Sequence, residues 1–171
     1  MNARDLQALF DYGHWADRKL LGVIARLTPE QFTRTVDNSH GCVRNTMAHV
    51  LSAEWGWINR CGGGPPRGAA LNPTDYPTPE ALLNLWEKVS AISNEYMAAL
   101  RDEDLSRVVE FTIAGGGNPW AMPVAELLQQ AALHGVHHRG QVSLLLRLMG
   151  FEPENFDILL YFAEKRAGAA R

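Results

Sequence analysis

The sequence contains only two cysteines, Cys42 and Cys61, in 171 residues. Two cysteines are too few for the disulfide framework of a secreted domain, so both are predicted to be reduced. No apolar run reaches the roughly 18–20 residues that a membrane-spanning helix needs, and the N-terminal segment mixes acids with bases, unlike a signal peptide. These absences predict a soluble, cytoplasmic protein with no membrane partner.

The sequence also lacks an excess of positive charge. Its 16 Lys and Arg residues are outnumbered by 19 Asp and Glu residues, which gives a net charge of -3. The basic residues are scattered, without a cluster or an interleaved aromatic series. Proteins that bind nucleic acid carry such a cluster to contact phosphates, so nucleic-acid binding is disfavoured.

The length and apolar content indicate one domain. A chain of 171 residues with 46% hydrophobic residues can bury one sizeable core but is short for two. No internal repeat or low-complexity tract interrupts it. We therefore treat residues 1–171 as a single domain.

Helical periodicity of the apolar residues predicts four long helices. These cover about residues 2–27, 43–60, 78–100 and 123–150. Thr28 and Gln31 form a capping-box pattern that predicts a further short helical turn, and Thr78 followed by Pro79 marks the start of the third long helix. Residues 151–166 predict a short final helix with a frayed tail.

Two segments between the long helices are not helical in pattern. The Gly/Pro-rich stretch 61–79 predicts a long surface loop, for which one candidate role is to cover a substrate. The β-branched residues Val108, Val109, Thr112 and Ile113 predict a short extended piece before the last long helix.

Two histidines lie in the apolar stripe of the last long helix. His134 and His138 are four residues apart, so they project from the same face, one turn from each other. A buried imidazole without a partner would cost roughly 1–3 kcal/mol. Two explanations remain: each ring hydrogen-bonds another core group, or the pair binds a metal ion. His137 projects from the flank of this helix, where a solvated or supporting role is expected.

A third ligand should come from another element, because two ligands do not complete a metal site. His14, His40 and His49 are the remaining candidates. His49 is preferred because it lies on one face of the predicted second long helix together with Thr46, Val50, Ala53 and Trp57. The sequence thus predicts a metal site formed by His49, His134 and His138.

Three sequence motifs resemble the DinB/YfiT-like family of proposed metalloenzymes. They are DYGHW near the start, MAHVLSAEW in the second long helix and HGVHHRGQ in the last one. The resemblance also includes the RDEDL turn and the closing GFEPENFDILLYF, so it covers nearly the whole chain. It implies an all-α, up-down four-helix bundle in which three histidines hold a divalent metal, here His49, His134 and His138.

The resemblance also suggests an activity. Characterised members of the family include transferases and isomerases in which the metal activates a low-molecular-weight thiol. This implies a small-molecule substrate, a metal ion (zinc, nickel or iron) and a thiol cofactor, and the dimers common among relatives imply a homodimer. Three histidine ligands leave a coordination position open, as in catalytic zinc sites. Hydrolysis and a non-enzymatic, stress-related metal-binding bundle remain the alternatives.

No general acid or base can be assigned from the sequence alone. Glu54 and Glu126 are most simply read as solvated or supporting residues. Arg139 is expected at an exposed edge or bonded to a neighbouring helix, and Gln141 is a candidate to orient a metal-bound imidazole. The five tryptophans are expected mainly in the core or at an interface.

Overall fold

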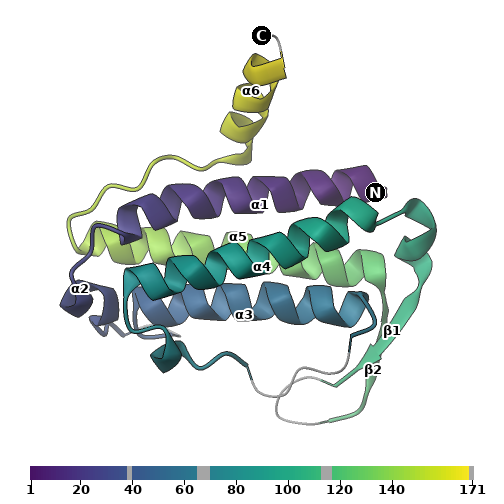
Figure 1. The fold of residues 1–171 in the computed structure, drawn as a ribbon, viewed down its shortest axis with the longest axis horizontal. Coiled ribbons are helices and arrows are strands. Elements are labelled where there is room, and N and C mark those ends of the chain that lie inside the picture. Colours follow the sequence, from purple (N-terminus) through teal and green to yellow (C-terminus); the bar gives the residue numbers. More distant parts are fainter. Residues whose placement is uncertain (38–39, 65–69, 113–116, 170–171) are drawn as a thin grey trace.

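Four long helices lie side by side in the computed structural model, which describes residues 1–37, 40–64, 70–112 and 117–169 (Figure 1). They are α1 (Ala3–Ile24), α3 (Val43–Cys61), α4 (Pro79–Ala99) and α5 (Val124–Leu148). The shorter elements are α2 (Pro29–Thr33), η1 (Pro73–Asp75), η2 (Asp102–Ser106), β1 (Val108–Phe111), β2 (Trp120–Pro123) and α6 (Ile158–Ala169). The predicted all-α four-helix bundle with a short C-terminal helix is confirmed.

The helices begin where side chains can accept hydrogen bonds from their first free N–H groups. Thr28 and Gln31 form the expected capping box at the start of α2. The Thr78 side chain accepts from the backbone N–H of Ala81, with Pro79 at the first position of α4. Asn2 and Asp5 form a second capping box, at the start of α1. This capping box was not among the features predicted from the sequence.

Two apolar clusters fill the bundle and show the direction of each helix. The end of α1, the starts of α3 and α4 and the end of α5 meet in one cluster, which includes Leu20, Met47, Leu82 and Leu146. The opposite ends of the same helices meet in the second cluster. The long helices therefore run up, down, down and up. This differs from the alternating course of the up-down bundle that the resemblance implied, because α3 and α4 point the same way.

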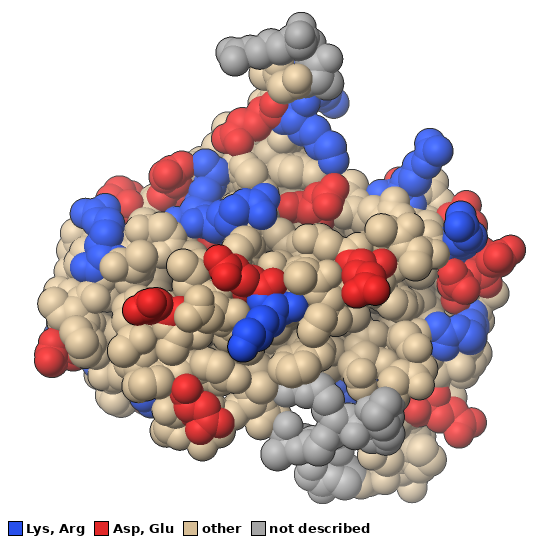
Figure 2. Space-filling view, in the orientation of Figure 1, with Lys and Arg blue, Asp and Glu red and all other residues tan. Residues whose placement is uncertain are grey.

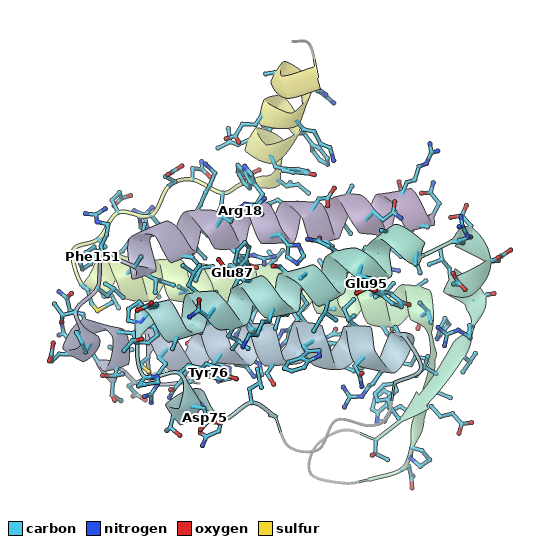
Figure 3. The ribbon with its side chains drawn as sticks, viewed as in Figure 1. Arg18, Asp75, Tyr76, Glu87, Glu95 and Phe151 are labelled. Atoms are coloured by element: carbon cyan, nitrogen blue, oxygen red, sulfur yellow. The ribbon has the colours of Figure 1, made fainter. Side chains whose placement is uncertain are left out.

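The Gly/Pro-rich segment between α3 and α4 makes this arrangement possible. It must return along the bundle before α4 begins, and a four-helix bundle can use such a long crossover connection. Its residue Leu71 donates its backbone N–H to Ser52 on α3. Tyr76 and Phe151 both pack against the core at the end where α4 starts (Figure 3). Residues 65–69 of this loop lie outside the described residues, so its predicted covering role remains a prediction.

The predicted extended piece is one half of a hairpin. β1 pairs antiparallel with β2, and Val108 lies opposite Pro123. The sequence predicts β1 but not β2, because the residues of β2, WAMP, do not form a run of alternating apolar residues. Ile113 lies outside the described residues, and Thr112 follows the strand.

The short helix α6 stands out from the bundle, beyond α1 (Figure 1). The aromatic ring of Tyr161 attaches it to Tyr12 and Trp15, with ring centroids 6.0 and 5.8 Å apart. Acidic and basic side chains are interspersed on the face shown in Figure 2. Among the described residues no helix is long and apolar enough to cross a membrane.

Candidate metal centre

The predicted histidines of α3 and α5 meet at the contact between these two helices. His49 projects from α3, and His134 and His138 project from successive turns of α5. His138 is 7% exposed, and the other two are half-buried. We call these three residues the histidine triad.

The Nε2 atoms of the triad lie close together. His134 Nε2 is 3.0 Å from His49 Nε2 and 3.1 Å from His138 Nε2. A ring nitrogen of neutral imidazole carries either one hydrogen or one lone pair, so His134 Nε2 cannot form two good hydrogen bonds at once. Two nitrogens bound to one ion at 2.0–2.1 Å lie no more than about 4.2 Å apart. The donor set therefore fits a shared divalent ion better than it fits hydrogen bonds.

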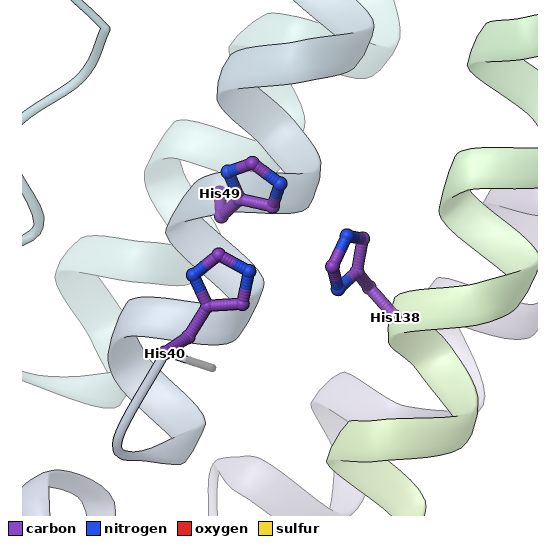
Figure 4. A group of neighbouring side chains, drawn as sticks. All are labelled: His40, His49 and His138. Atoms are coloured by element: carbon purple, nitrogen blue, oxygen red, sulfur yellow. The ribbon is translucent and has the colours of Figure 1, made fainter. Parts of the chain in front are cut away.

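A fourth imidazole, that of His40, lies against this group. One potential ligand atom each from His40, His49 and His138 lie within 4.8 Å of one another (Figure 4). The ring of His40 is stacked on that of His49, with centroids 4.2 Å apart and planes 26° apart. Stacked rings direct their in-plane lone pairs along nearly parallel planes, so these two rings do not point at one ion. The histidine triad is the better-formed set, because its rings are inclined by 55–81°.

Gln141 fixes the orientation of one triad member. Its Oε1 lies 2.7 Å from His138 Nδ1, one turn along α5. If Nδ1 carries the hydrogen and donates it to Gln141, Nε2 keeps its lone pair for a ligand. This is the role for which the sequence made Gln141 a candidate. His137 is exposed and meets Gln141 Nε2 at 3.3 Å, as expected for a residue on the flank of α5.

The surroundings keep the imidazoles neutral. Burial, followed by repulsion from neighbouring imidazoles, lowers the pKa of His49 and of His134 to about 4. Burial also lowers the pKa of His138 and of His40. All four rings are therefore unprotonated at neutral pH, the form that binds metal.

Comparison with known proteins identifies the family. The sequence model of the family described as "DinB family" matches residues 1–167 of this chain. The chain belongs to the DinB family. It is 22% identical to the Protein DinB of Bacillus subtilis (strain 168) over 157 residues, which cover 90% of this chain and 91% of that protein.

Solved structures of DinB-like proteins share the fold. A DinB-like protein from Bacillus cereus ATCC 10987 matches with a TM-score of 0.69 at 22% identity, over 90% of this chain and 97% of that one. A DinB-like protein from Bacillus subtilis matches with a TM-score of 0.64 at 18% identity, covering 88% and 96%. A conserved protein from Enterococcus faecalis matches with a TM-score of 0.65 at 15% identity, covering 83% and 95%.

A buried polar network lies among α1, α3, α4 and α5 of this DinB-family chain. Its buried members are His14, Asp17, Ser93 and Arg139, with Glu54 partly buried and Asn94 exposed at its edge. Of the two roles expected for Glu54, solvated or supporting, the solvated one is excluded, because its side chain is only 11% exposed. Its Oε1 lies 2.8 Å from His14 Nε2 and accepts from Ser93 Oγ at 2.5 Å.

The charges in this network support one another. Burial by itself would raise the pKa of Glu54, but hydrogen bonds and charge interactions with His14 and Ser93 outweigh it and lower that pKa. Burial would lower the pKa of His14, yet Glu54 and Asp17 raise it. The network thus favours an ionised Glu54 beside a His14 that holds its proton more readily.

Arg139 bridges α5 and α1 in the interior instead of lying at an exposed edge. Its Nη1 donates to Asp17 Oδ1 at 3.1 Å, and the two side chains are only 3% and 0% exposed. Burial raises the pKa of Asp17, and the Arg139 charge opposes that rise. A Cβ placed on Gly135 would lie 3.0 Å from the guanidinium, so this glycine makes room for Arg139.

A pattern in the sequence could have revealed this network. Glu54 lies one turn from Val50 and one turn from Ile58, both buried, so it belongs to the buried stripe of α3. Its direction relative to His49, which points away from that residue, does not reveal this. Arg139 and Asp17 likewise interrupt the buried stripes of α5 and α1 with opposite charges. Opposite charges in two facing apolar stripes indicate a buried pair.

Proposed function

We propose that the histidine triad holds one divalent metal ion and that this site carries the activity of the protein. The single observation that supports it is the approach of three Nε2 atoms to 3.0 and 3.1 Å, which hydrogen bonding alone does not satisfy. Gln141 sets the tautomer of His138, and burial keeps the ligands neutral. Imidazole suits zinc, nickel and iron alike, so the donor set leaves the choice among these metals open.

A metal bound by three imidazoles would supply Lewis acidity to a coordinated water or thiol at its open position. The thiols of the chain itself are poorly placed to act as nucleophiles. Cys42 and Cys61 are 3% and 0% exposed, and burial raises the pKa of Cys61 to about 11. A thiol-dependent reaction at this site would therefore use an external thiol.

We infer that the protein is a metal-dependent transferase for a low-molecular-weight thiol. The thiol would lose its proton to solvent. Its sulfur would form a bond to an electrophilic carbon of a small-molecule substrate, and the leaving group on that carbon would depart with the electron pair of the broken bond. The inference rests on the family resemblance and on the buried state of both cysteines. A free thiol of pKa about 8.5 is mostly protonated at neutral pH, so such a reaction needs an activating site.

Metal analysis of purified protein, and of protein reconstituted with Zn²⁺, tests the site. We expect one equivalent in the wild type, with a large loss in His138→Ala. His137→Ala is the matched control, because His137 neighbours the triad but is exposed. Full metal content in His138→Ala together with loss in His137→Ala would show that His137, and not His138, is the metal ligand. No metal in any wild-type sample would refute the site.

A screen of low-molecular-weight thiols against electrophilic substrates tests the activity. We expect turnover with metal-loaded wild type and none after chelation, with activity restored when metal is added back. Turnover that survives chelation, or none with any thiol despite a full metal site, would reject the transferase. Metal-dependent ester or amide hydrolysis in the same protein would then favour a hydrolase.

The cytoplasmic location predicted from the sequence stays a prediction. We also propose that the protein assembles as a homodimer. The support for a second copy is a pair of exposed apolar residues on α6, Leu159 and Phe162, together with an apolar groove on the same chain.

A further inference from the structure

His40 is the one member of the imidazole cluster that is not on a helix. It lies in the segment between α2 and α3, two residues before Cys42, the residue that precedes α3. Its carbonyl accepts from Asn45 Nδ2 at 3.0 Å, and the carbonyl of Gly41 accepts from the backbone N–H of Val36 at 2.7 Å. Gly41 has a φ of 82°, which suits glycine, so the turn that presents His40 is specifically formed.

The side chain of His40 lies beside two rings of the triad. Its ring centroid is 4.2 Å from that of His49 and 5.0 Å from that of His138. One ligand atom from each of these three rings lies within 4.8 Å of the other two, and two nitrogens on one ion lie no more than about 4.2 Å apart, so a small movement is enough for His40 to share an ion with the others. Because the backbone is held at the start of α3, rotation about the two side-chain torsions is the movement available to bring the nitrogen closer.

A fourth ligand position is available at the proposed site. The three imidazoles of the triad would approach an ion from α3 and α5, whereas His40 comes from the segment before α3 and lies next to His49, facing the side on which His138 lies (Figure 4). An open position in a resting site is filled by water or by a nearby donor. A neutral imidazole held within a side-chain rotation of the ion is such a donor.

We propose that His40 is a displaceable fourth ligand, which occupies the open position of the resting site and returns to its stack on His49 when a substrate thiol binds. This proposal rests on the proposed metal site. It adds that the chain closes its own site and that a thiol must compete with His40 for the open position. In the exchange, the bond from the ion to His40 would be replaced by a bond from the ion to the thiol sulfur, and the proton of the thiol would pass to solvent. No bond within the protein would be broken.

The experiment compares zinc-loaded wild type with His40→Phe, which keeps an aromatic ring on His49 but removes the ligand nitrogen. His137→Phe is the matched control. X-ray absorption should count four imidazoles on zinc in the wild type and in the control, but three in His40→Phe. The affinity for Zn²⁺ should fall about tenfold or more in His40→Phe, since even the loss of a residue that only supports a ligand has such an effect.

The response to 2-mercaptoethanol provides a second measurement. It should bind His40→Phe more tightly than wild type, because no protein ligand has to leave. Addition of the thiol should lower the imidazole count in wild type from four to three and leave the count in His40→Phe at three. Thermal unfolding of the metal-free proteins checks that both variants fold.

The outcomes separate this proposal from the metal site itself. Three imidazoles in wild type and in His40→Phe, with equal affinities for Zn²⁺ and for the thiol, would overturn the role of His40 and leave the triad intact. A wild type that binds no Zn²⁺ would overturn the proposed function and this inference together.

Discussion

Two imidazoles of the triad stay neutral over a wider pH range than a free histidine does. Burial lowers the pKa of His49 and of His134 from 6.5 to about 4. Between pH 6.5 and 4 the folded site therefore holds fewer protons than exposed histidines would. Protons compete with a metal ion only when they bind its ligands, so competition should begin well below pH 6.5.

We predict that metal and activity are lost together as the pH falls toward about 4, not as it passes 6.5. The measurement is metal content and turnover in the same samples, equilibrated from pH 7.5 down to pH 4. His137→Ala should follow the wild type, because His137 is exposed and outside the triad. Release with a midpoint near 6.5 would contradict the buried, neutral state of these ligands.

The same lowered pKa values affect the metal-free protein. An unfolded histidine of pKa about 6.5 binds a proton at a pH where the folded His49 does not. Stability contributed by the neutral, buried form is thus fully present above pH 6.5 and is lost as the pH falls from 6.5 toward 4. Bound metal should reduce this loss, because it favours the folded state.

Individual residues differed in how far the sequence could place them. The triad could be chosen because His49, His134 and His138 lie on helical stripes, where spacing fixes direction. His40 could not, because an irregular segment has no periodicity from which to infer where a side chain points. Only the chain path through Gly41 and Asn45 brings it to the cluster.

At the scale of helices and strands, local chemistry placed the boundaries well. Thr78 and Pro79 fixed the start of α4, and Thr28 with Gln31 fixed α2, because capping depends on residues three apart in sequence. The partner strand β2 was missed, because pairing depends on residues distant in sequence. The parallel course of α3 and α4 was not foreseen for the same reason.

The buried pair of Arg139 and Asp17 ties α5 to α1 and should matter for stability. Glu54 is also close enough for its charge to act on Asp17 and on Arg139. Removal of Arg139 would leave the fully buried Asp17 without its cation and would take one positive charge away from Glu54, which keeps His14. Removal of Asp17 would leave Arg139 with Glu54 nearby. Loss of the arginine should therefore be the more costly change.

We predict that Arg139→Met lowers the free energy of unfolding by about 3–5 kcal/mol, and by more than Asp17→Asn does. Urea unfolding of the metal-free proteins measures both. Arg147→Met, on the same helix, is the control: its partner Glu152 is 75% exposed, so the change should cost no more than about 1 kcal/mol. An Arg139→Met variant as stable as this control would show that the pair contributes little.

At the scale of the whole molecule, two apolar surfaces remain exposed. One is on α6, which carries Leu159, 71% exposed, and Phe162, 39% exposed. A groove of about 720 Å³ runs between α1 and the segment before α6, along the outer face of α5. Its lining includes Leu9, Leu133 and Val136, with Leu133 64% exposed.

These two surfaces suit each other in a second copy of the chain. An isolated helix of 12 residues is only marginally stable in water, so α6 needs more apolar contact than its attachment at Tyr161 provides. In a dimer with two-fold symmetry, α6 of each copy would lie in the groove of the other copy. The same contact would then form twice, and both exposed surfaces would be buried in each copy. The sequence suggested a dimer through family resemblance, but the outward course of α6 depends on tertiary packing and could not be read from it.

We predict that the wild type sediments at micromolar concentration as a dimer of the 19.0 kDa chain, and that Leu159→Glu on α6 and Leu133→Glu in the groove each convert it to monomer. A carboxylate buried in an apolar interface without a partner opposes association strongly.

Ile92→Glu is the matched control, because Ile92 is an exposed apolar residue, 37% exposed, on α4. It should leave the dimer intact. A wild type that sediments only as monomer would reject the dimer. A dimer that survives both Leu159→Glu and Leu133→Glu but is lost in Ile92→Glu would move the interface from α5 and α6 to α4.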